Sequence, residues 1–467
     1  MPDETVLVKA ETVVSKNRRK TTTIIRDPIH GFIDLSYYDF IPKIIQTAMF
    51  QRLRRLSQLG VSVFVYPSAT HNRFNHSLGA MQLFVGLFDH LYKDEPHDND
   101  YEKLRMTGIA SVLLHDIGHG PFSHASEQVF GFDHEDISNE IIESTEIRDI
   151  LQSPGIRTAD ITSVISKTAT GKMKLLSQLI SSQLDVDRLD YLARDVYFTG
   201  VGFGGVDLDR LIRTTSIYHG ESFLDGYAVV EEKGRHSVEA FLLTRSLMYD
   251  DVYYHKTTRC VEKLIEGIFE RIKELSSEKK NGCFKPPREL EFIQRMEPKE
   301  GSKNIICAED ILPLDDHYIY SLLLQWSKDS GVDPILYDFS RRILQRKLFK
   351  SIELPSGGLT SLLTKKNAVE KLVSENLRLD PKYYCILDEP RDRPYQPVGA
   401  PTSDEEIQES LKENIYIKLK DGSGFKEISE ISDVVDALTK RRQLIRLYFP
   451  EEIRQAVNDI VNPKDKK

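Results

Sequence analysis

Apolar residues with helical spacing dominate the chain between residues 40 and 256. The segments 76–92 and 102–120 are apolar on more than one face, and helices of this kind are buried inside a protein. Further helical patterns follow at 134–151 and 175–200. We therefore expect a mainly α fold with a helical core of roughly 250 residues.

The pattern changes at both ends of this core. Residues 1–22 are polar and without periodicity, which is typical of a flexible arm. The core, 23–275, should open with a small hairpin and close with one long helix. A helical extension is expected at 276–380, and short strand-like and helix-like segments predict a small α+β region at 381–467.

Charge and composition exclude several classes of protein. A formal net charge of −9 provides no overall positive field, so nucleic acid is not an expected partner. No apolar run is long enough to span a bilayer. The four cysteines are scattered without CxxC spacing, which argues against a disulfide scaffold or a zinc ribbon. We expect a cytoplasmic protein without a membrane anchor.

Histidines gather just after the second buried segment. The sequence "LLHDIGHGPFSH" ends that apolar run, and the neighbouring sequence adds further imidazoles. The histidines of this stretch that we consider are His71, His76, His115, His119, His124 and His134. In "HDIGH", His115 and His119 are four residues apart, which would place them on one helix face with Asp116 beside the first.

Three interpretations of this cluster compete. Buried structural histidines would each need a partner, which becomes demanding for so many ionisable groups. A zinc protease site needs a helix that continues through both histidines, whereas Gly118, Gly120 and Pro121 interrupt it here. A metal-dependent phosphohydrolase fits better, because imidazoles and carboxylates together hold a divalent ion.

Such a site needs ligands from other parts of the chain. His76 stands at the start of an apolar helix. The segment "LDVDRLDYLARD" adds four acidic residues, which by themselves would indicate a solvated helix face. They are Asp185, Asp187, Asp190 and Asp195.

These residues carry a resemblance to a known family. His76, the pair His115-Asp116 and Asp187 reproduce the H…HD…D signature of the HD-domain phosphohydrolases. The blocks "DPIHGFIDL", "FQRLRRLSQLG", "HNRFNHSLG", "HDIGHGPFSH" and "DVDRLDYLARD" resemble the deoxynucleoside triphosphate triphosphohydrolases of the SAM-and-HD-domain type. The likeness runs from about Asp27 to Lys256, without a SAM domain.

The resemblance implies a catalytic arrangement. His76, His115, Asp116 and Asp187 would hold a divalent metal ion (manganese, iron, magnesium, zinc or nickel). His124 would protonate the departing 5′ oxygen after water attacks the α-phosphorus. Glu127 replaces the aspartate that accompanies this histidine in relatives. Contacts with the phosphates are implied for His119, His134 and Arg73.

The resemblance also implies a substrate pocket for deoxynucleoside triphosphates. Gln58 and Leu59 match a pair that excludes a 2′-hydroxyl, and Tyr253 would stack under the sugar. Tyr249 stands where relatives carry a base-side histidine. The remaining positions match groups around the phosphates and the sugar 3′-hydroxyl, and they are Arg188, Tyr191, Asp195 and Arg245.

Relatives with this site assemble as tetramers and respond to nucleotide activators. The residues that match their activator sites are Gln51, Arg54, His255 and Lys256. Gln46 stands in place of the aspartate that reads guanine, and Glu231 in place of an arginine, so activation by GTP is not implied. A homo-oligomer, with a tetramer favoured, is expected.

Other functions stay open at this stage. A different HD phosphohydrolase could act on nucleoside monophosphates or phosphodiesters. A nucleotide sensor or nucleic-acid-binding protein with an inactive metal site is the alternative outside enzymes.

Overall fold

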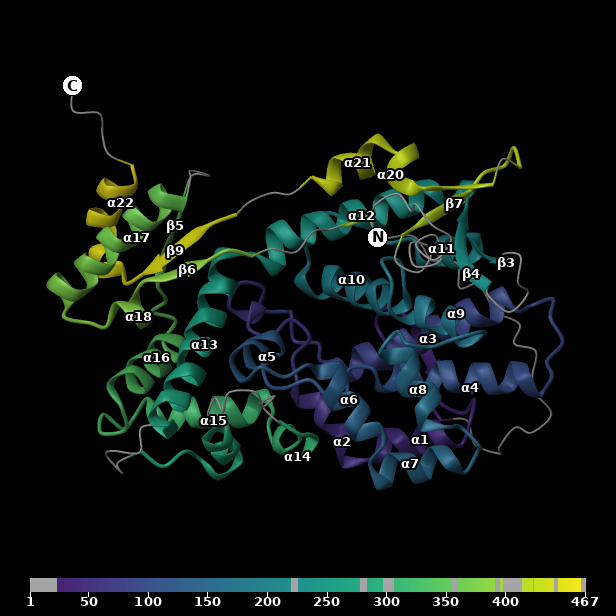
Figure 1. Cartoon of the computed structure of the whole chain (residues 1–467), viewed down its shortest axis with the longest axis horizontal. Helices are drawn as coiled ribbons and strands as arrows, with labels where there is room; N and C mark the ends of the chain where they lie inside the picture. The colour runs from purple at the N-terminus through teal and green to yellow at the C-terminus, as the bar shows by residue number, and fades with distance from the viewer. Residues whose placement is uncertain are drawn as a thin grey trace, which may run out of the picture.

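The computed structural model describes residues 23–219, 226–277, 284–296, 306–354, 359–390, 395–397, 414–422, 424–440 and 444–462. The predicted N-terminal arm, 1–22, lies outside the described residues. Figure 1 shows a helical body that holds α1 to α12 and a second lobe joined to it by the long helix α13 (Lys256–Ser277). The expectation of a mainly α fold with small α+β parts is confirmed.

A short hairpin precedes the helices, as the sequence predicts. Strand β1 (Ile24–Asp27) pairs with β2 (Gly31–Asp34) in an antiparallel register. Asp27 Oδ1 accepts the backbone N–H groups of Ile29 and His30, and Gly31 supplies the positive φ of 72° that the turn requires. The turn thereby fixes the direction in which the His30 side chain projects from the hairpin.

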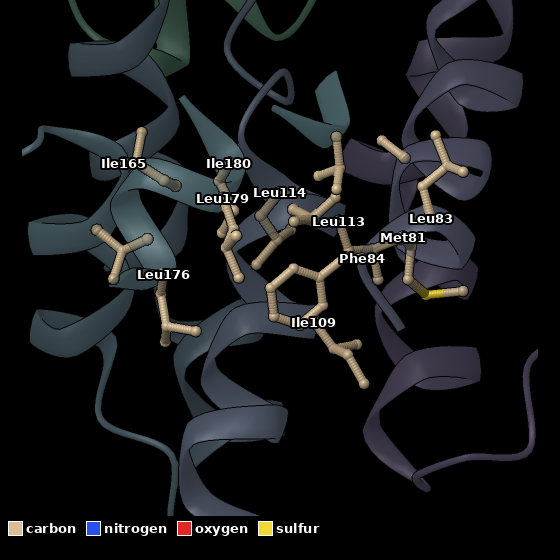
Figure 2. Close-up of a cluster of buried hydrophobic side chains, with 14 of the residues drawn as sticks. Met81, Leu83, Phe84, Ile109, Leu113, Leu114, Ile165, Leu176, Leu179 and Ile180 are labelled. Carbon is tan, nitrogen blue, oxygen red and sulfur yellow. The ribbon is translucent and has the colours of Figure 1, made fainter. Parts of the chain in front are cut away.

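The centre of the body is α3 (Arg73–Leu91), which packs against both α4 (Asn99–Leu114) and α10 (Val186–Thr199). Leucine, isoleucine and phenylalanine side chains from α3, α4, α8 (Thr158–Ile165) and α9 (Met173–Ile180) fill the space between them (Figure 2). Gly108 allows α3 and α4 to approach closely, since a Cβ there would come within 2.0 Å of the Phe84 ring. This dry packing holds the polar ends of α3, α4 and α10 in fixed positions.

Shorter helices surround this centre. Asn72 caps α3 and Asp98 caps α4 through their side-chain oxygens. The shorter helices are α1 (Phe40–Gln46), α2 (Ala48–Arg52), α5 (His124–Phe130), α6 (His134–Ile142), α7 (Thr145–Gln152), α11 (Leu208–Thr214) and α12 (Arg235–Met248).

Three segments that we predicted as continuous helices are divided, and the first of them, 134–151, forms α6 and α7 with a break between Ile142 and Thr145. The segment 175–200 stops at Ile180 and restarts at Val186, because Asp185 accepts backbone N–H groups of Ser182 and Arg188 and so caps a new helix. The predicted helix 238–275 divides into α12 and α13 around a π-helical turn, Tyr249–Tyr253. Such turns often occur at functional sites, and this one carries two predicted site residues.

The second lobe has its own hydrophobic core. An antiparallel sheet of order β5 (Lys350–Glu353), β9 (Arg446–Phe449), β6 (Ile386–Asp388) packs with helices of the second lobe. These helices are α15 (Asp316–Trp326), α16 (Pro334–Leu344), α17 (Leu359–Leu372), α18 (Pro381–Tyr384) and α22 (Arg454–Val461). The short helix α14 (Ala308–Ile311) instead packs in the core of the body, where it contacts α6.

The C-terminal region does not form a single unit. Strands β7 (Tyr416–Lys418) and β8 (Phe425–Glu427) extend the hairpin of β3 (Thr215–His219) and β4 (Gly226–Glu231) on the body, with β4 parallel to β7. They lead into α20 (Ile428–Ile431) and α21 (Asp433–Thr439), and α21 packs on α12. The segment that we treated as one α+β region, 381–467, is thus shared between two cores because its apolar strands pair with partners far apart in the chain.

Within the described residues, no helix is both long and apolar enough to cross a bilayer.

Candidate active site

Three helix ends converge at the centre of the body. His76 lies in the first turn of α3, His115 and Asp116 directly follow α4, and Asp187 lies in the first turn of α10. Where helix ends meet, their side chains can project into the space between the packed helices and form a binding site. The four residues predicted to hold a metal are therefore brought together.

The prediction that His115 and His119 share a helix face is wrong. Helix α4 ends at Leu114, and residues 115–118 form turns. The turn passes so close to α6 that a Cβ on Gly118 would lie 2.4 Å from the His134 carbonyl oxygen. Ser138 of α6 secures it, since its hydroxyl donates to the His115 carbonyl and accepts the Gly118 N–H.

The nitrogen and oxygen atoms of the cluster lie at short distances. His76 Nε2 is 2.9 Å from Asp187 Oδ1 and 3.7 Å from Asp116 Oδ2. His115 Nε2 is 3.5 Å from Asp187 Oδ1 and 3.4 Å from Asp116 Oδ1. One donor atom from each of His76, His115 and Asp116 can be chosen so that all lie within 4.8 Å of one another.

The two imidazoles are oriented for ligation. His76 Nδ1 is 2.8 Å from Asp190 Oδ2, and His115 Nδ1 is 2.7 Å from the Val112 carbonyl oxygen. Both Nε2 atoms are buried and make no hydrogen bond of acceptable geometry. A histidine whose Nδ1–H is held by an oxygen presents the Nε2 lone pair to a metal. Together with two carboxylates, this set fits a divalent cation.

The charges around the cluster support the same conclusion. Burial lowers the pKa of His76 and His115, but the neighbouring Asp187, Asp190 and Asp116 carboxylates outweigh it and raise these pKa values to about 10 and about 9. Burial raises the pKa of both carboxylates, but Arg73, His115 and His119 hold the pKa of Asp116 well below its usual range. His115 and His76 do the same for the pKa of Asp187. The pocket therefore attracts positive charge.

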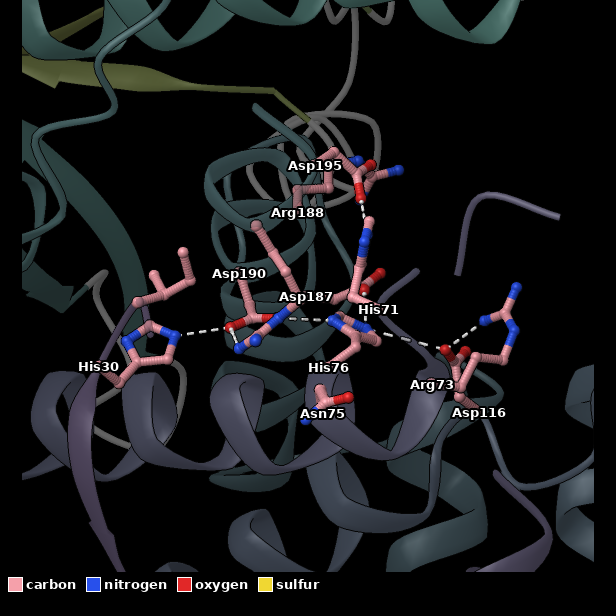
Figure 3. Close-up of polar contacts among 12 residues, drawn as sticks. His30, His71, Arg73, Asn75, His76, Asp116, Asp187, Arg188, Asp190 and Asp195 are labelled. Carbon is pink, nitrogen blue, oxygen red and sulfur yellow. Dashed lines mark hydrogen bonds and ion pairs between the residues drawn. The ribbon is translucent and has the colours of Figure 1, made fainter. Parts of the chain in front are cut away.

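Asp190 is a site residue that the sequence did not single out. Its carboxylate is fully buried and contacts three groups: His76, His30 through a 2.6 Å contact with Nε2, and the Arg194 guanidinium (Figure 3). Arg194 Nη1 in turn donates to Asp27 at the end of β1. The hairpin is thus tied to a predicted metal ligand. The i to i+4 spacing of Asp190 and Arg194 in a helix was the available signal.

The interpretation of the acidic segment as a solvated face is wrong for three of its members. Asp185, Asp190 and Asp195 are all buried. Asp185 serves as the cap of α10, and burial raises its pKa to about 6. Asp195 accepts from Tyr253 at 2.8 Å and contacts His71 Nε2 at 2.7 Å. The sequence did not assign His71 a role.

A second cluster lies beside the first and is organised by Glu127. Its Oε1 is 2.6 Å from His119 Nδ1 and its Oε2 is 3.2 Å from His134 Nδ1. The two imidazoles stack with centroids 3.8 Å apart. Although burial raises the pKa of Glu127, these histidines hold it well below its usual range. Burial, Arg73 and His134 lower the pKa of His119 to about 4.

His124 is set apart from these buried groups. It begins α5, its side chain is 85 % exposed, and its Nδ1 is 3.5 Å from Glu127 Oε2. Arg73 is buried in the cluster, where Nη1 contacts Asp116 Oδ2 and Nη2 donates to Ser123 Oγ at 2.8 Å. His124, the candidate general acid, therefore lies on the rim of the site. Arg73, which is predicted to contact the phosphates, lies inside it.

Four of the predicted substrate residues, Arg188, Tyr191, Arg245 and Tyr249, lie close together near Asp187. Burial raises the pKa of Tyr191, and the positive charges of Arg245 and Arg188 partly oppose this rise. Tyr249 lies near the same tyrosine. The Arg245 guanidinium carbon lies 5.8 Å from the Tyr249 ring centroid. On another segment, Gln58 N–H donates to the His71 carbonyl, and Leu59 follows it. Gln58 Oε1 is buried without a partner.

The residues predicted for activator binding fall in two regions of the chain, 46–54 and 255–256. Gln51 Nε2 donates to the Ile45 carbonyl while its Oε1 accepts from Arg54 Nε at 2.9 Å, and Gln46 is exposed at the end of α1. His255 and Lys256 lie at the start of α13. No contact described here joins the two groups within this single chain.

Comparison with known proteins places the chain in a family. The HD domain family matches residues 73–195, and the HD associated region matches residues 206–306. The uncharacterized protein YwfO of Bacillus subtilis is 35 % identical over 92 % of both chains. Human deoxynucleoside triphosphate triphosphohydrolase SAMHD1 is 29 % identical, over 53 % of this chain and 44 % of that protein.

A solved structure agrees with these matches. The crystal structure of a phosphohydrolase from Bacteroides thetaiotaomicron superposes with a TM-score of 0.74 at 30 % identity, over 92 % of this chain and all of that one. The chain belongs to the HD-domain phosphohydrolases, and the resemblance stated from its sequence motifs is confirmed.

Proposed function

We propose that the protein hydrolyses deoxynucleoside triphosphates to the deoxynucleoside and inorganic triphosphate. His76, His115, Asp116 and Asp187 would hold the divalent ion, which when bound supplies Lewis-acid stabilisation of charge on phosphoryl oxygens. The similarity to SAMHD1 proteins, named as deoxynucleoside triphosphate triphosphohydrolases, supports this substrate class.

One observation carries the proposal of a substrate with several phosphates. Arg245 Nε and Nη1 and Arg188 Nε are buried and have no hydrogen-bond partner. Leaving charged donors unpaired inside a protein costs considerable free energy. Guanidinium groups bind phosphoryl oxygens well, so a chain of phosphates that extends from Asp187 towards these arginines would satisfy them.

Proton transfer is assigned to the rim of the site. Water attacks the α-phosphorus, the bond from phosphorus to the 5′ oxygen breaks, and His124 donates a proton to that oxygen. His119, His134 and Arg73 contact the phosphates, and Glu127 orients the imidazoles. The exposure of His124 supports this role, because Nε2 is free to approach a leaving group.

The sugar would lie between two partly buried segments, 57–60 and 249–253. We assign Gln58 and Leu59 to exclusion of a 2′-hydroxyl and Tyr253 to the face of the sugar, with Asp195 near the 3′-hydroxyl. Arg188, Tyr191 and Arg245 complete the phosphate side, and Tyr249 the base side.

Assembly and regulation are part of the same proposal. We assign the protein to a homo-oligomer, with a tetramer favoured. A nucleotide activator would contact Gln46, Gln51, Arg54, His255 and Lys256. Because these residues lie in two separate regions of one chain, contact between neighbouring copies would complete such a site.

A product assay tests the proposed reaction. The purified protein is incubated with manganese or magnesium and each deoxynucleoside triphosphate, with and without GTP, and the products are separated by chromatography. Deoxynucleoside and intact triphosphate, lost in Asp116→Ala and retained in the exposed control Asp136→Ala, are the expected result. We expect at least a ~10³-fold loss for Asp116→Ala. Metal analysis identifies the ion.

Other products would overturn the proposal. Release of orthophosphate or pyrophosphate would place attack at another phosphorus. No turnover of any triphosphate would direct attention to nucleoside monophosphates and phosphodiesters, and nucleotide binding without turnover would indicate a sensor.

A further inference from the structure

A buried carboxylate of helix α15 in the extension contacts two segments of the body. Asp316 begins α15 and is only 2 % exposed. Its Oδ1 accepts the Phe122 N–H at 2.8 Å, and its Oδ2 accepts the Ser57 N–H at 2.8 Å. Each oxygen therefore holds the backbone of a different segment of the body.

Both segments lead directly into the candidate active site. Ser57 precedes Gln58 and Leu59, and the same strip of chain accepts the Arg73 N–H through the Leu56 carbonyl at 3.0 Å. Phe122 precedes Ser123, whose hydroxyl binds Arg73, and His124. Asp316 thus lies behind two different walls of one pocket.

The second of these segments needs external support. Phe122 and Ser123 both have positive φ, 53° and 47°, a region that non-glycine residues occupy only when their surroundings enforce it. Besides Asp316, the Tyr320 ring of α15 contacts the Phe122 ring with centroids 5.5 Å apart. The strained backbone is therefore held from α15.

A third contact ties the start of the same loop. The buried Arg52 donates from Nη2 to the His119 carbonyl and from Nε to the Leu314 carbonyl, both at 2.7 Å. Leu314 lies two residues before Asp316. The loop 119–123 is therefore held near both of its ends, at His119 through Arg52 and at Phe122 through Asp316.

We propose that Asp316 is a positioning residue that sets the spacing between the segment carrying Gln58 and Leu59 and the loop carrying His124. The expected effect on the sugar and on the leaving group rests on the proposed function. The link itself, the two backbone hydrogen bonds that Asp316 accepts, does not depend on that function. Through this link, the extension controls the geometry of a pocket to which it contributes no predicted catalytic group.

Hydrogen exchange tests the link without reference to activity. Asp316→Asn leaves one acceptor and turns an amide NH₂ towards the other backbone N–H. We expect exchange in peptides spanning 53–64 and 119–125 to accelerate by about tenfold or more. The matched control is Asp333→Asn, because Asp333 is also buried in the extension, where it caps α16 and pairs with Arg271 at 2.9 Å.

A second variant keeps the test decisive if Asp316→Asn folds poorly. Tyr320→Leu removes the ring contact with Phe122 and leaves the carboxylate in place, so only the 119–125 peptide should exchange faster. Unchanged exchange at both peptides in Asp316→Asn, or equal acceleration in Asp333→Asn, overturns the proposal.

Kinetics then connect the link to catalysis. We expect Asp316→Asn to lower kcat/KM for a deoxynucleoside triphosphate by about 10–100-fold and to reduce the preference over the matching ribonucleotide, with bound metal unchanged. Unchanged preference and rate in a variant that exchanges faster would overturn the catalytic consequence. If the wild type hydrolyses no triphosphate, the proposed function fails, while the exchange result still decides the role of Asp316.

Discussion

His76 Nδ1 lies 2.8 Å from Asp190 Oδ2, and this contact fixes which nitrogen of His76 faces the candidate metal site. Outer carboxylates of this kind typically account for 10–100-fold in metal affinity. We therefore expect Asp190→Asn to weaken metal binding by about that factor, measured by titration against a competing chelator. Asp209→Asn, which alters an exposed pair with Arg213 on α11, should leave it unchanged; equal affinity in both variants would contradict the assignment.

The close approach of α3 and α10 makes Gly79 irreplaceable. A Cβ there would lie 2.0 Å from Asp190 Oδ1 and 2.2 Å from Arg194 Nη2. Since these groups belong to a buried ion pair, we expect Gly79→Ala to lower the free energy of unfolding by about 3–5 kcal/mol.

Gly86 of the same helix is the matched control. A Cβ there would meet Ile212 at 3.8 Å, an ordinary contact. Gly86→Ala should stabilise the protein by up to about 1 kcal/mol because alanine favours the helix. Denaturant unfolding measures both variants, and similar effects of the two substitutions would refute this reasoning.

The carboxylate of Glu127 contacts the stacked imidazoles of His119 and His134, and a glutamine side chain could not make both contacts. Each of its oxygens faces an Nδ1 atom, whereas glutamine offers only one acceptor. We expect Glu127→Gln to lower kcat by about 10–100-fold and to leave the metal content intact, since its contacts are with His119, His124 and His134. Glu135→Gln, at the start of α6, serves as the control, and loss of metal from Glu127→Gln would argue against this division of roles.

Arg245 should act mainly in substrate binding. Its unpartnered donors would form charge-assisted hydrogen bonds, worth about 1.5–3 kcal/mol, so Arg245→Ala should raise KM for a triphosphate by about 10–100-fold. Steady-state kinetics checks this, with Arg213→Ala on the exposed face of α11 as control. A normal KM in Arg245→Ala would remove Arg245 from the pocket.

Thiol chemistry offers a prediction away from the site. Burial raises the pKa of Cys260 and Cys385 to about 12, so both remain protonated at pH 8 and should resist alkylation in the native protein. Cys307 is only partly buried and should react faster. Mass spectrometry of labelled peptides measures this; rapid labelling of Cys260 before unfolding would show that its environment is open.

The sequence anticipated the ligand set but not the way in which its parts are held. The H…HD…D pattern predicted His76, His115, Asp116 and Asp187, which do lie together. Local spacing misplaced His115 and His119, because the close passage past Ser138 of α6 ends the helix early. It also left Asp190 unassigned, since nothing local distinguishes a buried aspartate partner from a solvated one.

The division of the chain shows the same limit. The sequence predicted short strands and helices in 381–467, and the described residues of this region contain both. Pairing of β7 with β4 and of β9 with β5 joins residues far apart in the chain, and no local pattern encodes such a choice.

By itself, the sequence determined the helical core and the hairpin, because periodicity is a local property. Its resemblance to the HD-domain phosphohydrolases indicated which residues converge on the candidate site, because short motifs are also local. Only the tertiary structure decided which nitrogen of His76 is free, which arginine donors lack a partner, and that Asp316 supports two walls of the pocket. These properties depend on distances between segments remote in the chain, which packing alone sets.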